Sequence, residues 1–358
     1  MSASKTDRTP SGRVAVIGLG GTIAMRSADG RGAVHGLVAE DLVDALPESV
    51  ARRVAHVENF RQVPGAHLGL QDLADLAARI NALEAGGAAE GFVVVQGTDT
   101  IEETVFALEL LCRGPAPVVV TGAMRHAGQT SSDGAANIAN AIVLAASHAA
   151  RDRGAMVCFN DEVHAGWAVQ KTAATNLAAF SSPGFGPVGH VIEGRADLML
   201  TARRWPAVAD DPALVEPAPV ALVAAALGEG PELLEAVAQG HWRGLVVQAL
   251  GAGHLPANWV APLERLTRDM PVVLATRVSR GPVLQATYAF PGSEQDLIAR
   301  GLIPAGYLCA SKARILLSLA LGAGQQAVAA QKQDDSVTNW GRWAVLSPAA
   351  GGPPPYVA

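Results

Sequence analysis

Thr98, Asp99 and Lys171 are residues whose types together point to a specific chemistry. Thr98 and Asp99 lie in a short turn that follows the apolar run 92–95. A threonine hydroxyl is a weak nucleophile that needs a base, and a lysine can be that base when its surroundings lower its pKa. A neighbouring carboxylate can orient the lysine. The three residues therefore suit nucleophilic acyl transfer, as a variant of the serine–lysine relays.

Thr22 is a second candidate hydroxyl, and it follows an earlier apolar run. Residues 13–17 predict a buried strand, and the glycine-rich stretch 18–24 is its exit loop. A dinucleotide-binding fingerprint is excluded because Ile23 occupies the position of its third glycine and no clear helix begins there. The glycines permit a tight turn that directs the Thr22 hydroxyl into a crevice. A hydroxyl that only satisfies the local backbone is an equal alternative.

Each of these residues also has an ordinary interpretation. A single lysine is most often solvated, and Asp99 can be no more than an acid at the start of the following helix. The functional interpretation depends on their conjunction, because Thr22, Thr98 and the motif Thr121-Gly122-Ala123 all follow apolar strands. Open α/β sheets bind ligands at the carboxyl ends of their strands.

The elements that position these residues alternate between strands and helices. Strands are expected at 13–17, 50–61, 92–95, 117–120 and 155–159, and helices at 39–46, 70–83, 101–112 and 133–148. We expect Thr100 to begin the third helix in a capping box with Glu103, and Asp133 to cap the fourth. Residues 27–36 predict a mobile loop and a candidate lid. The alternation predicts right-handed crossovers and an α/β fold whose N-terminal sheet is parallel and doubly wound, of the flavodoxin or Rossmann kind.

The length of 358 residues predicts two domains, because single cores rarely grow that large. We expect an N-terminal catalytic α/β domain at 13–202 and a linker rich in Pro, Asp and Ala at 203–219. A smaller C-terminal α/β domain follows at 220–348, with strands at 220–225, 245–250 and 271–276 and a helix at 310–321. The last residues, 349–358, are expected to form a loose tail.

The composition excludes several classes of protein. A net charge of −6 argues against a nucleic-acid partner. The three cysteines, Cys112, Cys158 and Cys309, form no metal or disulfide pattern and predict buried thiols in a reducing compartment. The start of the chain lacks the apolar core of a signal peptide, and no apolar run is long enough to span a bilayer. We therefore expect a cytoplasmic protein without membrane partners or a bound metal.

Four motifs together make the chain recognisable. They are Gly20-Gly21-Thr22-Ile23-Ala24, Gln96-Gly97-Thr98-Asp99-Thr100, Thr121-Gly122-Ala123-Met124-Arg125, and Asn160-Asp161 followed by Lys171-Thr172. In this order and at these separations, from about residue 14 to residue 321, the chain resembles the bacterial L-asparaginases of the asparaginase/glutaminase family. The resemblance implies two-domain α/β subunits and a hydrolase of linear amide C–N bonds that works without a cofactor.

The resemblance also implies roles for individual residues. Thr22 would attack the side-chain amide of L-asparagine, releasing ammonia and leaving an acyl-enzyme, and water activated through Thr98 and Lys171 would then release L-aspartate. Asp99 would bind the α-amino group of the substrate, and the Ala123 carbonyl would lie near the leaving amide. The Thr98 amide is a suitable oxyanion donor. Gly21 and Gly97 belong to the same substrate-binding set.

A neighbouring subunit is also part of what the resemblance implies. Family members are homotetramers built as dimers of dimers, in which the second domain of one subunit completes the site of another. His254 and Glu294 match the contributing positions. By themselves, His254 is more often a structural histidine and Glu294 more often a surface acid.

Two departures from the family pattern concern activation and substrate binding. The lid 27–36 lacks the tyrosine that helps to activate the nucleophile, and His35 stands there instead. The loop Gly65-Ala66-His67 lacks the serine that binds the α-carboxylate, although a His67 imidazolium would attract that group. Loss of one such contact costs about 1.5–3 kcal/mol, which raises KM without abolishing turnover.

Two alternatives to asparagine hydrolysis follow. The chain is either an amidase for another carboxamide, such as glutamine or a larger β- or γ-amide, or a metabolite-binding relative without catalysis. The joint presence of Thr22, Thr98, Asp99 and Lys171 speaks against the second.

Overall fold

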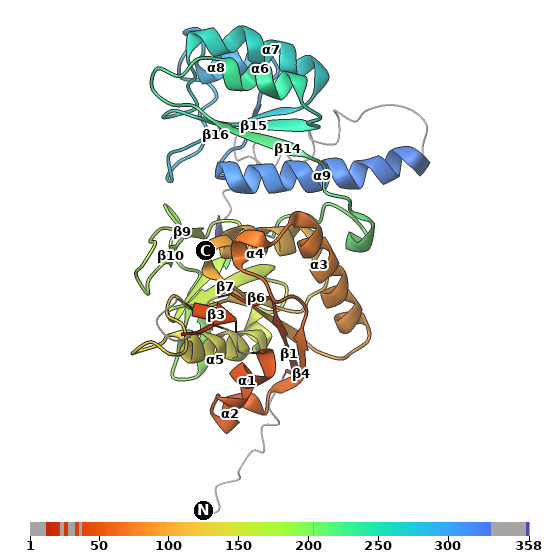
Figure 1. Ribbon diagram of the computed structural model, residues 1–358, viewed down its shortest axis with the longest axis vertical. Helices are drawn as coiled ribbons and strands as arrows, with labels where there is room; N and C mark the ends of the chain where they lie inside the picture. Colours follow the sequence, from red (N-terminus) through yellow and green to blue (C-terminus); the bar gives the residue numbers. More distant parts are fainter. Residues whose placement is uncertain are drawn as a thin grey trace, which may run out of the picture. The chain divides into compact units, whose positions relative to one another are not determined.

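The computed structural model describes residues 12–21, 25–27, 33–35, 38–202, 204–330 and 356–357. The chain forms two compact units, which are shown in Figure 1. The first contains residues up to 182 together with 186–205, and the second contains 183–185 and the chain from 206 onwards. The main boundary, between 205 and 206, lies within the stretch 203–219 that the composition marks as a linker.

The first unit is built on an eight-stranded sheet with the order β12-β11-β8-β7-β6-β5-β1-β4. Its parallel part consists of β4 (Val54–Asn59), β1 (Val14–Gly18), β5 (Gly91–Val95), β6 (Val118–Thr121) and β7 (Ala155–Phe159). Strands β1, β5, β6 and β7 are buried throughout, as their apolar sequences predict. The order of these five strands is that of a flavodoxin-like doubly wound sheet, which confirms the predicted fold class.

The other three strands extend the sheet, each paired in antiparallel fashion with its neighbour. They are β8 (Glu162–Ala165), β11 (Gly189–Ile192) and β12 (Arg195–Leu198). The two residues that join β7 to β8, Asn160 and Asp161, have φ values of 49° and 66°. Positive φ at both central residues is the mark of a type I′ hairpin turn, and Asn and Asp adopt it readily. The first 200 residues therefore form a mixed sheet instead of the wholly parallel one expected.

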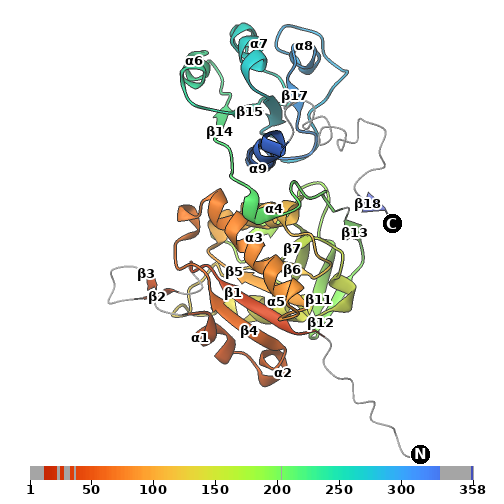
Figure 2. The same ribbon diagram turned by 90° about the vertical axis from the view of Figure 1, so that its right-hand side faces the viewer.

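The helices of the first unit cover both faces of the sheet. They are α1 (Ala39–Asp44), α2 (Glu48–Ala51), α3 (Leu70–Ala85), α4 (Ile101–Leu111) and α5 (Gly134–Ala145), with 3-10 turns η2 (Gly65–His67), η3 (Thr98–Thr100) and η4 (His148–Ala150). Helix α3 packs on α4, whereas α5 packs on α2. Figures 1 and 2 both show α3 and α4 on one side of the sheet and α5 on the other.

This placement of α5 corrects the prediction that all crossovers are right-handed. Strands β5, β6 and β7 follow one another in the same direction across the sheet. Helices α4 and α5, which connect them, lie on opposite faces, so the two crossovers have opposite hands. Such an exception to the usual rule needs a connection long enough to change faces, and residues 122–133 between β6 and α5 provide it.

Two further predictions need correction in the N-terminal part. Residues 25–27 and 33–35 form strands β2 (Met25–Ser27) and β3 (Ala33–His35), which pair in antiparallel fashion, so part of the expected loop is regular. The rest of the expected lid lies outside the described residues. The strand expected at 50–61 is shorter, because residues 48–51 form α2 and β4 covers only 54–59.

A buried carboxylate joins the end of the first unit to its sheet. Glu109 on α4 is 3% exposed and accepts hydrogen bonds from the amides of Ala155 (2.6 Å) and Trp205 (2.8 Å). The ring of Trp205 packs edge-on against Phe106 at 5.6 Å. Burial raises the pKa of Glu109 to about 7, although both amides and Arg204 act in the opposite direction.

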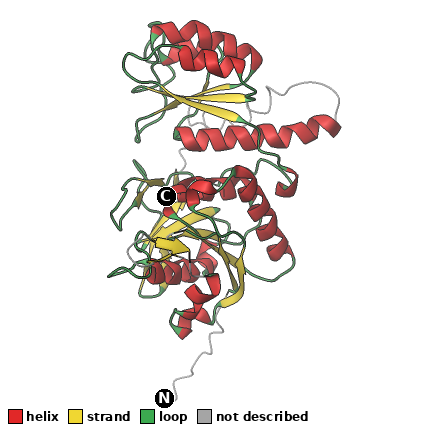
Figure 3. Cartoon of the chain, in the orientation of Figure 1, coloured by secondary structure: helices red, strands yellow, loops and turns green. Residues whose placement is uncertain are grey.

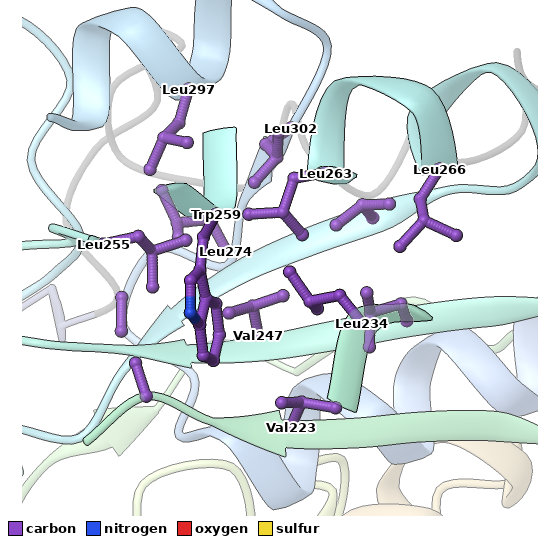
Figure 4. Packing of buried hydrophobic residues seen from close by; sticks show 14 of the residues in the cluster. Val223, Leu234, Val247, Leu255, Trp259, Leu263, Leu266, Leu274, Leu297 and Leu302 are labelled. Carbon is purple, nitrogen blue, oxygen red and sulfur yellow. The ribbon is translucent and has the colours of Figure 1, made fainter. Parts of the chain in front are cut away.

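The second unit contains a four-stranded parallel sheet. Its strands are β14 (Val220–Ala224), β15 (Gly244–Ala249), β16 (Val272–Thr276) and β17 (Ile303–Pro304), in that spatial order. Helices α6 (Glu232–Gln239), α7 (Val260–Asp269) and α8 (Glu294–Ala299) lie on one face and α9 (Ala310–Ala330) on the other, as the red ribbons of Figure 3 show. The core between α6, α7 and the sheet is centred on Trp259, which is fully buried (Figure 4). Its indole N–H donates to the Glu229 carbonyl at 3.2 Å.

The remaining elements are short. They are β9 (Gln170–Lys171), β10 (Phe180–Ser181), β13 (Thr201–Ala202), η5 (Pro212–Leu214), η6 (Ala257–Trp259) and β18 (Tyr356–Val357). The tail expected at 349–358 lies outside the described residues apart from β18. Cys112 and Cys158 are buried as expected, and burial raises the pKa of both thiols, whereas Cys309 is partly exposed. Within the described residues, no helix combines the length and apolar character that a membrane span requires.

Candidate active site

The candidate site lies where the winding direction of the parallel sheet reverses. From β1 the chain continues to β4 on one side, and it then returns past β1 to β5 on the other. The exits of β1 and β5 are therefore adjacent, and such a switch point is the usual ligand position in doubly wound sheets. The amide of Leu19 donates to the Val95 carbonyl at 2.9 Å and joins the two exits.

Glycines allow the loops at this edge to touch backbone to backbone. Gly21 has φ = 88°, and a Cβ built on it would overlap the backbone nitrogen of Gly97. A Cβ on Gly97 would lie 3.2 Å from the Gly65 nitrogen. Three predicted substrate-binding glycines, Gly21, Gly65 and Gly97, thus form one contiguous surface. No larger residue at position 21 permits this approach.

Lys171 contacts both residues predicted to act with it. Its Nζ lies 2.9 Å from Thr98 Oγ1 and 2.9 Å from Asp99 Oδ1. Thr98 is only 5% exposed, whereas the Asp99 side chain is 69% exposed and that of Lys171 17%. The buried hydroxyl is therefore reached by the ammonium group from within the protein, while the carboxylate faces solvent and is accessible to a ligand. Because Asp99 is so exposed, its ion pair adds little to stability.

The hydroxyl of Thr100 has a different role from the one expected. Thr100 Oγ1 donates to the Gly65 carbonyl at 3.1 Å and accepts from Gln96 Nε2 at 3.2 Å, and it makes no cap hydrogen bond with α4. The predicted capping box with Glu103 is wrong, because the 3-10 turn η3 precedes the helix and turns this hydroxyl toward the loop 64–67. Thr100 thereby joins the β5 exit to the loop that carries Ala66 and His67, both of which are exposed.

Asp133 and Asn137 fix the exit of β6. Asp133 begins α5, but its carboxylate accepts from the amides of Met124 (3.0 Å) and Arg125 (2.9 Å) instead of capping the helix as expected. Asn137 Nδ2 donates to the Gly122 carbonyl at 3.0 Å. Both residues lie at the start of α5, the helix of the crossover between β6 and β7. Their hydrogen bonds to residues 122–125 hold the loop before this helix in place. Sequence reasoning missed them as site residues.

Two residues of the β6 exit differ in what they can contribute. Ala123 is 1% exposed and lies next to Gly122, where a Cβ would lie 2.5 Å from the Gln96 carbonyl oxygen. The β5 and β6 exits therefore also touch. Thr121 does not direct its hydroxyl into the crevice, because its Oγ1 donates to the Cys158 carbonyl at 2.7 Å.

The predicted nucleophile Thr22 lies outside the described residues. Gly21, which precedes it, is buried against Gly97. For His35, the structure describes only the backbone, which as the last residue of β3 pairs with Met25.

His254 and Glu294 of the second unit form a pair of their own. His254 Nε2 lies 3.2 Å from Glu294 Oε2, and Tyr288 and Phe290 pack edge-on to the imidazole at 4.9 and 5.1 Å. Glu294 is fully buried and accepts from the amides of Thr287 (2.8 Å) and Tyr288 (2.7 Å). Although burial acts to raise the pKa of Glu294, these hydrogen bonds hold it below its usual value. The alternative of a surface acid is therefore wrong.

The described residues offer no metal centre. No group of three or more His, Cys, Asp or Glu side chains is arranged to hold an ion in this part of the chain. What the first unit presents at its switch point is a buried threonine hydroxyl, a lysine and an open carboxylate. This set, at the strand exits of a flavodoxin-like sheet, has the residue types expected for nucleophilic acyl transfer.

Comparison with known proteins identifies the family. The family Asparaginase, N-terminal, matches residues 13–204, and the Glutaminase/Asparaginase C-terminal domain matches 219–333. The chain belongs to the asparaginase family, which confirms both the predicted resemblance and the predicted enzyme class, a hydrolase of linear amide bonds.

Several relatives are similar over most of their length. A probable L-asparaginase of Deinococcus radiodurans is 36% identical over 316 residues, which cover 87% of this chain and 94% of the relative. A probable periplasmic L-asparaginase of Haemophilus influenzae is 32% identical over 323 residues, covering 86% and 88%. The crystal structure of a probable cytoplasmic L-asparaginase from Campylobacter jejuni matches with a TM-score of 0.78 and 30% identity, covering 86% of this chain and 94% of that one.

Proposed function

We propose that this protein hydrolyses L-asparagine to L-aspartate and ammonia by double displacement through a threonine acyl-enzyme. Family membership and the names of the relatives support the reaction. The observation that carries the proposed mechanism is the contact of Lys171 Nζ with both Thr98 Oγ1 and Asp99 Oδ1. No cofactor takes part in this mechanism.

The first half of the reaction forms an ester. The Thr22 hydroxyl adds to the amide carbon, its proton passes to the leaving nitrogen, and ammonia departs. The oxyanion formed on the way is stabilised by the Thr98 amide, which lies at the start of η3. The carbonyl of Ala123 accepts a hydrogen bond from the amide nitrogen. The network of Asp133 and Asn137 supports this role, because it fixes the loop on which Ala123 lies.

The second half of the reaction hydrolyses that ester. Thr98 and Lys171 take a proton from water, which attacks the ester carbon, and the proton returns to Thr22 as L-aspartate leaves. A general base is more effective where bulk water is excluded, and Thr98 meets this requirement because it is only 5% exposed.

Asp99 and the loop 65–67 are suited to bind the amino-acid part of the substrate. Asp99 pairs with the α-ammonium group, because its carboxylate is 69% exposed beside the site. The α-carboxylate binds the Gly65-Ala66-His67 loop, where the exposed His67 replaces the missing serine. The hydrogen bond from Thr100 to Gly65 supports this assignment, since it ties the loop to the turn that carries Asp99. Gly21 and Gly97 line the floor between them.

The first experiment is a measurement of ammonia release from L-asparagine, from L-glutamine and from asparagine whose α-carboxylate is blocked as an amide. Rapid release from L-asparagine alone supports the proposed substrate. Release only from glutamine or from the blocked compound contradicts it and supports an amidase for another carboxamide. The name of the C-terminal family, which includes glutaminase, makes glutamine the more relevant of these alternatives.

Two variants test the mechanism itself. Thr22→Ala and Thr98→Ala should each nearly abolish turnover of L-asparagine and keep the circular-dichroism spectrum of the native protein. Thr121→Val is the matched control, because the Thr121 hydroxyl is bonded to Cys158 instead of facing the site. Near-normal turnover by Thr22→Ala contradicts the threonine acyl-enzyme.

We further propose a cytoplasmic homotetramer, a dimer of dimers in which His254 and Glu294 of one subunit complete the site of its neighbour. The buried, ionised Glu294 beside His254 supports a binding role for this pair. Co-expression of Thr22→Ala chains with Glu294→Gln chains tests this arrangement. Hybrid oligomers should regain activity that neither variant has alone, and absence of recovery in confirmed hybrids contradicts shared sites. The relatives include a probable cytoplasmic and a probable periplasmic protein, so cell fractionation tests the location.

A further inference from the structure

Lys171 lies on a small element of two short strands. Strands β9 and β10 have two residues each, and within the described part of the chain they form a separate two-stranded sheet, with Lys171 opposite Phe180. A two-stranded ribbon of this length is not stable by itself. A lysine side chain also has four rotatable bonds, whose ordering costs roughly 2 kcal/mol. Something outside the ribbon must therefore fix Lys171 against Thr98.

Glu102 is the residue that meets this need. The backbone N–H of Lys171 donates to Glu102 Oε2, while the Nζ of the same lysine contacts Thr98 and Asp99. Glu102 is the second residue of α4, only a few positions after the η3 turn. One short stretch of chain, 98–102, therefore holds the lysine at both ends, at its backbone and at its ammonium group.

The other strand of the ribbon has separate anchors. Ser182, directly after β10, has its Oγ 3.0 Å from Nδ1 of the buried His164 on β8. The ring of Phe180 packs against Phe159 at 4.9 Å. These contacts fix β10 relative to the large sheet, and they reach Lys171 only indirectly, through its pairing with Phe180. The contact with Glu102 is made by Lys171 itself.

We infer that Glu102 is a positioning residue for the proton relay, because its carboxylate fixes the backbone of Lys171 and thereby sets Nζ against Thr98 Oγ1. The inference rests on the proposed function of Lys171. An acid in the first turn also stabilises a helix by its interaction with the helix dipole, so a purely structural role is the alternative for Glu102. The next residue, Glu103, is also an acid in the first turn of α4, so its replacement provides a control for the effect of the helix dipole.

Three variants and one measurement separate these roles. Glu102→Ala removes the acceptor, and misplacement of a catalytic group by about 1 Å costs on the order of 100-fold, so kcat for L-asparagine should fall roughly 10- to 100-fold. KM should change little, because Asp99 and the 65–67 loop remain. Glu102→Gln keeps a carbonyl oxygen that can accept the same N–H, and it should recover most of kcat. Glu103→Ala should retain the native kcat.

The outcomes are distinguishable from failure of the proposed function. If Lys171→Ala keeps normal turnover, the proposed relay is wrong. If Lys171→Ala is inactive while Glu102→Ala keeps the native kcat, the relay stands and the inference about Glu102 is wrong. Equal losses in Glu102→Ala, Glu102→Gln and Glu103→Ala overturn it as well, since they indicate a general effect of helix charge.

Discussion

Replacement of Gly21 by alanine tests whether the β1 and β5 exits are really in backbone contact. Gly21 has φ = 88°, which costs an L-residue about 1–2 kcal/mol. The new Cβ would also overlap the backbone nitrogen of Gly97, and overpacking of this kind costs about 1–3 kcal/mol. The free energy of unfolding should therefore fall by about 2–5 kcal/mol in Gly21→Ala.

A second glycine separates the two contributions. Gly87 also has a positive φ, 65°, but a Cβ there meets nothing within 4 Å. Gly87→Ala should thus lose only about 1–2 kcal/mol, the backbone part alone. Urea unfolding of both variants measures the difference, and ammonia release should fall in Gly21→Ala only, because only Gly21 displaces the turn that carries Thr98. Equal destabilisation by the two variants would refute the reasoning.

Three further predictions concern single contacts. Burial raises the pKa of Glu109 to about 7 from a usual 4.5, so the folded state binds the carboxyl proton more tightly than the unfolded chain does. The contribution of this proton to the free energy of unfolding is therefore fully present below about pH 4.5 and is lost as the pH rises through about 7. Glu109→Gln should remove that decline, on the order of 3 kcal/mol, as measured by urea unfolding at pH 5 and pH 8. Thr100→Val loses the hydrogen bond to Gly65, worth about 1 kcal/mol, so KM for L-asparagine should rise several-fold in initial-rate measurements, and Thr100→Ser should restore it. Asn137→Ala leaves the buried Gly122 carbonyl without its partner, and thermal unfolding should show a loss of about 1–3 kcal/mol.

The strand exits were predictable from the sequence because local signals mark them. Apolar runs that end in Gly97-Thr98 and in Thr121-Gly122 located β5 and β6 and their exit turns, and the threonine, lysine and aspartate types restricted the chemistry. The contact between Lys171 and Thr98 was predictable only because a threonine hydroxyl needs a base beside it. The structure places Lys171 Nζ 2.9 Å from Thr98 Oγ1.

Features that depend on distant partners were not predictable. Thr100 and Asp133 both have the residue types of helix caps, yet their side chains bond to the Gly65 carbonyl and to the 124–125 amides. Tertiary acceptors and donors here outcompete the local ones, and no spacing rule reveals them. Glu294 is buried for the same reason, since its partners are amides of an irregular loop. The hand of the β6–α5–β7 crossover contradicts a strong general rule, so the sequence could only predict the opposite.

The central position of β1 has a consequence for biosynthesis. Val14 pairs with Val54 on one side and with Gly91 on the other, so β1 is bordered on both sides by strands that are synthesised after it. At about 5–20 residues per second, this fully buried, apolar strand waits several seconds for β5. Pairing over such long stretches of sequence is also slow. A nascent chain that stops before β5 should therefore aggregate through β1, and a chaperone that binds apolar segments should recognise this strand first.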